Sequence, residues 1–158
     1  MKGDAEVLLV SGPLDLGATR HLPAGVSQGS KLEVVVLFND VSGTLTALRL
    51  AAQLGRSLDA RINLVALQAV PYALELARPP IVMEWLEERL RDLASKSPID
   101  THVDIILSRD IRRALRQVLK PHSLVVIGGR RRWWRTREQR LAEKLRHDGH
   151  QVISAYLP

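Results

Sequence analysis

The sequence predicts an α/β protein with a five-stranded, mainly parallel sheet that is covered by helices on both faces. Along residues 31–157, short apolar runs alternate with segments of helical periodicity, which is typical of βαβ units. Several of these runs are continuously apolar, as expected for strands that are buried on both faces. The chain has 158 residues, of which 46% are hydrophobic, and this is enough for one domain with a core of its own.

Five segments are predicted to be strands. Each is rich in aliphatic residues and is bounded by turn-forming or polar residues. Because helices separate them, right-handed crossovers between parallel strands are expected. In chain order, the predicted strands are residues 33–38, 61–67, 101–107, 124–127 and 151–157.

Four helices are predicted between these strands. The first carries apolar residues at helical spacing up to Gly55, which we interpret as its stop. The third, at residues 111–119, has the clearest apolar face of the chain. In the last, Thr136 and Gln139 have the spacing of a capping box, so a helix is expected from there to about His147.

The second helix is predicted to follow a pair of prolines at residues 79–80, which suits a first helical turn. Trp85 flanks the apolar stripe of this helix, and we interpret it as core or near-core packing. The stripe consists of Val82, Leu86, Leu90 and Leu93.

Residues 1–30 form a separate segment in this interpretation. Residues 6–10 resemble residues 123–129 in composition and suggest an extra strand, whereas residues 12–30 are rich in Gly, Pro and small residues. We therefore describe residues 1–30 as an N-terminal arm or an edge strand plus linker. Residues 31–158 form the α/β domain.

Composition and motifs exclude several classes of function. The chain has no cysteine, and therefore no disulfide, thiolate metal site or cysteine nucleophile. No apolar run approaches the about 20 residues that span a bilayer, and no signal-peptide pattern is present, so we expect a cytoplasmic protein. His147 and His150 lie three residues apart at the end of a predicted helix. They suggest either a pair of metal ligands, for which no third ligand is apparent, or positive charge that interacts favourably with the helix dipole. No nucleotide-loop or nucleophile-elbow motif is found, so we assign no catalytic or metal site and do not expect an enzyme.

Residues 123–139 are the most informative segment. An apolar strand runs into Gly128 and Gly129, then into arginines and two tryptophans, and a helix begins beyond them. Where a parallel strand ends in glycine before a helix, backbone N–H groups and the helix dipole bind phosphates. This segment and the following helix also contain most of the excess of basic over acidic residues that gives the chain its net charge of +6. Such a cluster indicates one anionic partner site, or else a solvated basic face.

Adjacent tryptophans amid arginines mark the middle of this segment. Because they are adjacent in a loop, we do not expect both side chains to face the core. Tryptophan and arginine anchor protein interfaces, bind single-stranded nucleic acid and suit anionic lipid headgroups. The remaining interpretation is one tryptophan that folds back over the sheet end. We assign a partner-binding or anion-binding role, with a protein partner as first choice, to Arg132, Trp133, Trp134 and Arg135.

Residues 31–157 resemble the universal stress protein family. The Val-Leu-Phe-Asn-Asp run at residues 36–40, followed by Ser42, looks like the family's first strand with its serine-containing turn. Residues 105–108 look like its third strand, and residues 123–129 like its fourth strand and the opening of its phosphate loop. The order and spacing of these segments carry the resemblance. It implies a doubly wound sheet of order 3-2-1-4-5 and, often, a homodimer paired through the last strand.

ATP-binding members of the family carry a glycine, two residues, a second glycine, nine residues, and then glycine with serine or threonine. Gly128 matches the first glycine, but Arg131 stands at the second. Glu138 and Gln139 fall near the final pair. A capping box there would also occupy N–H groups that the family uses for phosphates. The resemblance therefore implies that the triphosphate cradle is absent.

A base-and-ribose site is the remaining nucleotide hypothesis. The resemblance places Asp40 at the aspartate that contacts the nucleoside, and Leu67 at a position whose backbone meets the adenine. Arginine side chains would then hold the phosphates. The alternative for Asp40 is a turn aspartate that caps the first helix. This hypothesis assigns binding of ATP or another adenine nucleotide to Asp40, Leu67, Gly128, Gly129, Arg130 and Arg131.

The functional prediction is a non-enzymatic stress-response or regulatory domain of the universal stress protein type. It has a degenerate nucleotide site and an Arg/Trp loop that contacts a partner or an anion. The alternative is a switch for ATP, AMP or a cyclic dinucleotide that uses arginines for phosphate. A second alternative is a regulatory module related to those of membrane transporters or sensor kinases.

Overall fold

A central parallel sheet organises the protein. The computed structural model describes residues 7–11, 19–21, 32–76, 78–79, 81–130 and 136–157. The sheet has seven strands in the order β2-β1-β5-β4-β3-β6-β7, and its last five are parallel to one another. When these five strands are numbered 1 to 5 along the chain, their order across the sheet is 3-2-1-4-5, which confirms the prediction. They are β3 (Glu33–Leu37), β4 (Arg61–Ala69), β5 (Thr101–Ser108), β6 (Leu124–Arg130) and β7 (Gln151–Leu157).

The N-terminal segment adds two strands to this sheet. β1 (Val7–Ser11) pairs antiparallel with β5, in a register that sets Leu8 opposite Leu107. β2 (Thr19–His21) pairs antiparallel with β1. The expected N-terminal strand is therefore present, but β2 and not β1 forms the edge. The expected linker lies largely outside the described residues.

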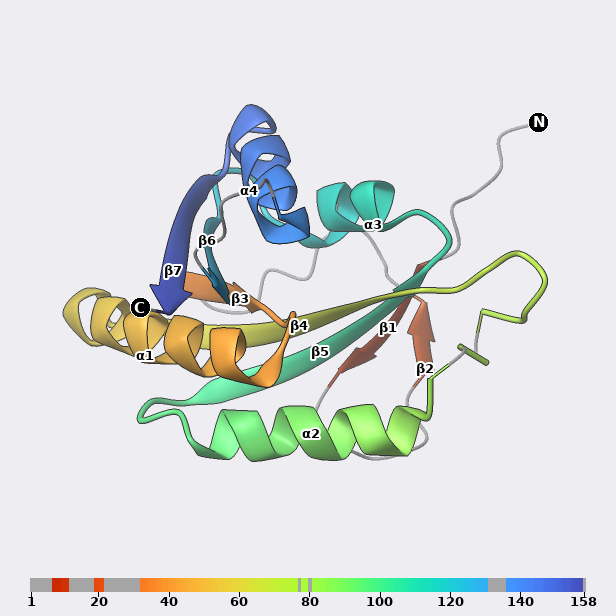
Figure 1. The fold of residues 1–158 in the computed structure, drawn as a ribbon, viewed down its shortest axis with the longest axis horizontal. Helices are drawn as coiled ribbons and strands as arrows, with labels where there is room; N and C mark the ends of the chain where they lie inside the picture. The colour runs from red at the N-terminus through yellow and green to blue at the C-terminus, as the bar shows by residue number, and fades with distance from the viewer. Residues whose placement is uncertain are drawn as a thin grey trace.

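Two helices cover each face of the sheet. α1 (Val41–Leu58) and α2 (Met83–Ser95) lie on one face, and α3 (Ile111–Val118) and α4 (Arg137–His147) lie on the other (Figure 1). This arrangement follows from β3, whose Val34 and Val36 point to the α1/α2 face and whose Val35 and Leu37 point to the α3/α4 face. Both kinds of position are buried, which explains why the strand is continuously apolar.

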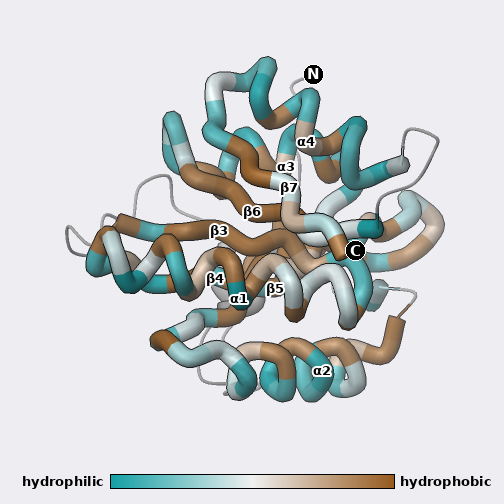
Figure 2. Tube along the Cα trace, turned by 60° about the vertical axis from the view of Figure 1, so that its left-hand side comes forward, coloured by the Kyte–Doolittle hydropathy of each residue, from teal (hydrophilic) through white to brown (hydrophobic). Residues whose placement is uncertain are grey.

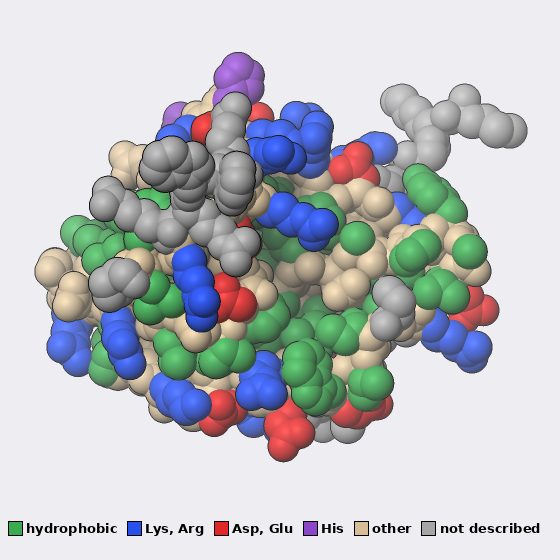
Figure 3. Space-filling model, viewed as in Figure 1, with side chains coloured by type: hydrophobic (Ala, Val, Ile, Leu, Met, Phe, Trp, Pro, Cys, Tyr) green, Lys and Arg blue, Asp and Glu red, His purple; other side chains and the backbone are tan. Residues whose placement is uncertain are grey.

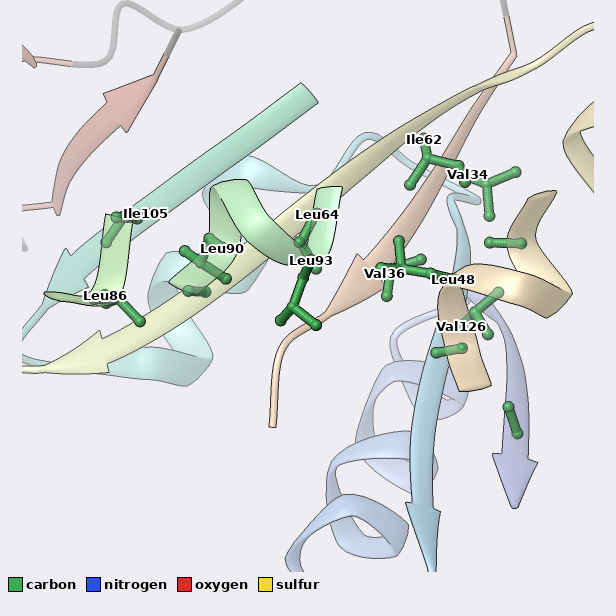
Figure 4. Close-up of a cluster of buried hydrophobic side chains, with 14 of the residues drawn as sticks. Val34, Val36, Leu48, Ile62, Leu64, Leu86, Leu90, Leu93, Ile105 and Val126 are labelled. Carbon is green, nitrogen blue, oxygen red and sulfur yellow. The ribbon is translucent and has the colours of Figure 1, made fainter. Parts of the chain in front are cut away.

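The hydrophobic core consists of one cluster on each side of the sheet. On the α1/α2 side, Leu48 of α1 packs with Val36 and Val126, and Leu90 of α2 packs toward Ile105 (Figure 4). On the other side, the core includes Leu115 of α3 and Leu145 of α4. The strands form a hydrophobic layer between helices whose outer surfaces are largely hydrophilic (Figure 2).

α1 is longer than the sequence predicted. It begins at Val41, inside the expected turn, and continues through Gly55 to Leu58, where Asp59 ends it in the left-handed conformation (φ 47°). Gly55 is therefore not a stop. A Cβ atom there would lie 2.6 Å from Cδ1 of Ile99, so this glycine lets the segment before β5 pack closely against the helix.

α2 also differs from the prediction. It begins at Met83, beyond the Pro79 that we expected in its first turn, and Val82 is its N-cap and 64% exposed. The buried apolar stripe is limited to Leu86, Leu90 and Leu93, and the interpretation of Trp85 as core or near-core packing is wrong. One residue before Leu86, Trp85 lies well around the helix from this stripe, is 48% exposed and stacks with the guanidinium of Arg89 at 5.3 Å.

A polar cluster, which the sequence analysis did not predict, lies near the amino ends of the central strands. Asn63 Nδ2 donates hydrogen bonds to Glu33 Oε1 (3.1 Å) and to Asp104 Oδ2 (2.8 Å). His102 Nε2 lies 3.1 Å from Asp104 Oδ1, and Asp104 is only 7% exposed. The hydrogen bond from Asp104, aided by the charges of Asp104, Glu33 and Asp100, raises the pKa of His102 above 6.5 against the opposing effect of burial.

This cluster predicts a pH-dependent contribution to stability. Because the pKa of His102 is raised on folding, the protonated histidine stabilises the fold fully below its unfolded value of 6.5, and this contribution is lost as pH rises through the folded pKa. We expect the free energy of unfolding of the wild type, relative to His102→Gln, to fall in urea titrations as pH rises from 6.5 through the raised pKa of the folded state, and to level off above it. The effect is small because the side chain is about half exposed. A difference that does not change with pH would contradict the prediction. Asp104→Asn should reduce the pH dependence, because it removes the carboxylate that raises the pKa of His102 most, while Glu33 and Asp100 remain.

Candidate functional site

The candidate site lies where β3 and β6 end side by side. From β3 the chain proceeds outward through β4 to β5, and then returns to the other side of β3 to form β6 and β7. Ligands of open α/β sheets bind at such a switch point, beyond the carboxyl ends of the strands. Asp40 follows β3, and Gly128, Gly129 and Arg130 end β6, so the structure brings these four predicted residues to one edge.

The turn after β3 is tied to β6 through Asn39. Its Nδ2 donates to the carbonyl oxygen of Gly128, and its backbone N–H donates to Thr44 Oγ1. The Thr44 hydroxyl in turn donates to Asn39 Oδ1 at 3.3 Å, and Thr44 is fully buried. Neither Asn39 nor Thr44 was predicted from the sequence to be part of the site. The only local signal was the Asn-Asp pair directly after a buried strand, a pair common in turns.

Gly128 is required by packing. A Cβ atom on Gly128 would lie 1.7 Å from the carbonyl oxygen of Gly43 and 2.9 Å from its Cα atom. The first turn of α1 therefore rests directly on the backbone of β6, and only glycine fits there. Gly129 is different, because the nearest atoms to its added Cβ are those of Glu138 at 4.0 Å, an ordinary contact. The glycine pair that suggested a phosphate loop thus contains one glycine needed for helix–strand contact.

Asp40 is the N-cap of α1. Its backbone is extended (φ −132°, ψ 167°), and its Oδ1 accepts the N–H of Gly43 at 2.8 Å. The alternative interpretation, in which Asp40 caps the first helix, is therefore confirmed. The residue is also exposed at the end of β3.

Leu67 lies at the same edge on β4. Phe38 N–H donates to the carbonyl oxygen of Val65 at 2.8 Å, and Leu67 is two residues further along, level with Asn39. Its side chain is partly buried and packs on the α3/α4 side of the sheet. Only its backbone is therefore in a position to face a ligand at the edge.

The amino end of α4 is closed by its own side chains. Gln139 N–H donates to Thr136 Oγ1 (3.3 Å), and Thr136 N–H donates to Gln139 Oε1 (3.0 Å), which confirms the predicted capping box. Two N–H groups that a phosphate would need are thus already bonded. Glu138 adds a carboxylate to this first turn.

The basic segment is described only in part. Arg130 ends β6 and is exposed. The other predicted residues of the segment lie outside the described residues. They are Arg131, Arg132, Trp133, Trp134 and Arg135.

His122 and His150 make contacts with the backbone of the turns before β7 and β6. His150 Nδ1 accepts the N–H of Ser123 at 3.2 Å, and His122 Nδ1 lies 3.1 Å from the carbonyl oxygen of Gly149. These contacts hold the turn before β6 against the turn before β7. Within the described ranges, no three His, Asp or Glu side chains gather in a way that could hold a metal ion. No helix in those ranges is long and apolar enough to cross a membrane.

Comparison of the chain with protein-family models, with curated proteins and with solved structures finds no match in any of the three.

The two neighbouring glycines provide a matched test of the helix–strand contact. Gly128→Ala should lower the free energy of unfolding by at least about 2 kcal/mol, because the methyl group forces α1 away from β6. Gly129→Ala should change it much less, because its methyl group meets only ordinary contacts. Urea denaturation followed by circular dichroism measures both. If both variants lost the same free energy of unfolding, the contact with Gly43 would not explain why position 128 requires glycine.

Proposed function

We propose that the protein is a non-enzymatic regulatory domain of the universal stress protein type, with a stress-response role, that binds an anionic ligand or partner at the carboxyl edge of β3 and β6. The supporting observation is the placement of exposed Asp40 and exposed Arg130 on either side of the switch point. Binding at this edge follows the general behaviour of doubly wound sheets. The resemblance in sequence suggests the regulatory role.

In this proposal the anion is held by side chains and not by a backbone cradle. The first turn of α1 is packed on Gly128, and the first turn of α4 is closed by its capping box. Arg130 and the arginines that follow it in sequence remain as phosphate-binding groups, because guanidinium groups bind phosphate through paired hydrogen bonds. The nucleotide site is accordingly degenerate.

The second candidate is a nucleotide switch at the same edge. The observation that favours it is the charge arrangement, with a carboxylate after β3 and a guanidinium at the end of β6. A carboxylate can accept hydrogen bonds from ribose hydroxyls, while arginine holds phosphates. ATP, AMP and cyclic dinucleotides all carry both groups.

The homodimer is also part of the proposal. β7 is the last strand in the sheet order, and no strand among the described residues covers its outer edge. Tyr156 on this strand is 39% exposed. Pairing with β7 of a second copy would satisfy backbone groups that an open edge leaves unpaired, and would give a two-fold symmetric dimer.

Calorimetric titration separates the two ligand hypotheses. We expect pyrophosphate and ATP to bind with similar affinity, and Arg130→Gln to weaken both about tenfold, if the site recognises anions alone. A nucleotide switch predicts instead that ATP, AMP or a cyclic dinucleotide binds at least about tenfold more tightly than pyrophosphate.

Asp40→Ser is the informative second variant in that experiment. Serine retains the N-cap, so stability should be nearly unchanged, whereas Asp40→Ala should cost about 1 kcal/mol. For a nucleotide switch, Asp40→Ser removes the preference of ATP over pyrophosphate. If no compound produces heat, the anion site at this edge is refuted, and the segment following Arg130 becomes the bait for a macromolecular partner.

Light scattering tests the dimer. Tyr156→Glu places a charge on the exposed edge of β7 and should shift the mass from dimer to monomer. Tyr72→Glu is the matched control, because Tyr72 is 86% exposed in the loop after β4 and far from β7 in the sheet order. A mass that Tyr156→Glu leaves unchanged would remove β7 pairing from the proposal.

A further inference from the structure

A groove separates α3 from α4 on their face of the sheet. α3 packs over β4 and β5, whereas α4 packs over β6 and β7, so β3 lies between them. With strands about 4.8 Å apart, the two helix axes are separated by about three strand spacings, or about 14 Å. Helices in direct contact lie only about 8–10 Å apart. The resulting groove has a volume of about 400 Å³, within the range of sites for small organic molecules.

The floor of this groove is apolar. Leu115 of α3 and Leu141 and Leu145 of α4 line it, and all three belong to the hydrophobic core on this side of the sheet. Its length is limited by α3, whose eight residues span about 12 Å. A groove this short favours a small molecule with an apolar body over a peptide helix.

The rim of the groove is cationic on both sides. Arg112 and Arg116 of α3 face Arg140 and Lys144 of α4, against two carboxylates, Glu143 and Asp148. Arg116 Nε lies 3.7 Å from Asp148 Oδ2 and so closes one end of the groove. In the part of the chain that the structure describes, the side chains of Arg112, Arg140 and Lys144 have no salt-bridge or hydrogen-bond partner. In Figure 3, several Lys and Arg side chains lie over the α3 and α4 layer at the top of the view.

Two of the four lining cations, Arg112 and Arg140, lie at the end of the groove away from the Arg116–Asp148 ion pair. Each helix follows a strand of the parallel sheet and runs back along it, so α3 and α4 both begin at the carboxyl edge. Arg112 lies in the first turn of α3, and Arg140 is the fourth residue of α4. The amino ends of both helices also carry carboxylates, because Asp110 caps α3 and Glu138 lies in the first turn of α4, so the two guanidinium groups and not the helix dipoles provide the positive charge here.

We propose that the groove between α3 and α4 binds an amphipathic organic anion, with a carboxylate or phosphate head between Arg112 and Arg140 and an apolar body along Leu141 and Leu145. The apolar floor alone accepts neutral compounds, and the cations alone accept inorganic anions. Their combination selects a molecule that has both parts. This site is distinct from the proposed site at the ends of β3 and β6.

Decanoate is a suitable probe in calorimetry below its micelle-forming concentration, because it pairs a carboxylate with a short alkyl chain. Decyl phosphate tests the other head group. We expect both to bind, and decanol and acetate to bind at least about tenfold more weakly. Arg112→Gln/Arg140→Gln should weaken decanoate about tenfold or more. Arg130→Gln should not weaken it, which separates this site from the proposed function.

The matched control is Arg49→Gln/Arg56→Gln, which removes the same charge from exposed positions of α1 on the opposite face. Its affinity for decanoate should stay within about twofold of the wild type. Equal losses in the two double variants would show a general charge effect and overturn the proposal. Absence of binding would overturn it, as would decanol binding as tightly as decanoate. Binding only to phosphatidylglycerol vesicles would indicate a membrane surface and overturn it as well.

Discussion

The first turn of α1 lies directly on the backbone of β6, and much of the structure depends on this contact. Gly43 and Gly128 meet with no side chain between them, and Asn39 bridges the same two segments by a hydrogen bond across 89 residues of sequence. Close approach at this point places α1 over β3, β6 and β7 together. One helix thereby covers the centre of the sheet on its side, and α2 completes the layer over β5.

This contact also determines what the edge of the sheet offers to a ligand. In a phosphate loop, glycines leave backbone N–H groups free for the ligand. Here Gly128 serves the packing of α1, Asp40 bonds to Gly43, and Thr136 and Gln139 bond to each other's backbone. What faces outward is a carboxylate and a guanidinium group, Asp40 and Arg130. Recognition at this edge would therefore depend on charged side chains more than on the main chain.

The two faces of the sheet are covered unequally. α1 and α2 contact each other, whereas α3 and α4 lie over opposite halves of the sheet, with β3 between them. The short α3 and the wide spacing leave leucines of the core at the bottom of a groove whose rim is basic. The basic residues behind the net charge of +6 are thus not confined to the segment after β6, because several of them, on α3 and α4, line this groove.

The amino-acid sequence by itself determined the succession of strands and helices, the apolar faces of α3 and the capping box of α4, because periodicity and capping are local properties. It did not determine that Gly55 lies within α1, because that outcome depends on Ile99, which the fold brings against the helix. The exposure of Trp85, in contrast, follows from local properties, namely its one-residue offset from Leu86 and its stacking with Arg89 one turn later on the same helix. Only the tertiary structure decided the role of Gly128, the network around Asp104 and the groove between α3 and α4. Each of these joins segments that are distant in the chain, and sheet order and register alone bring such segments together.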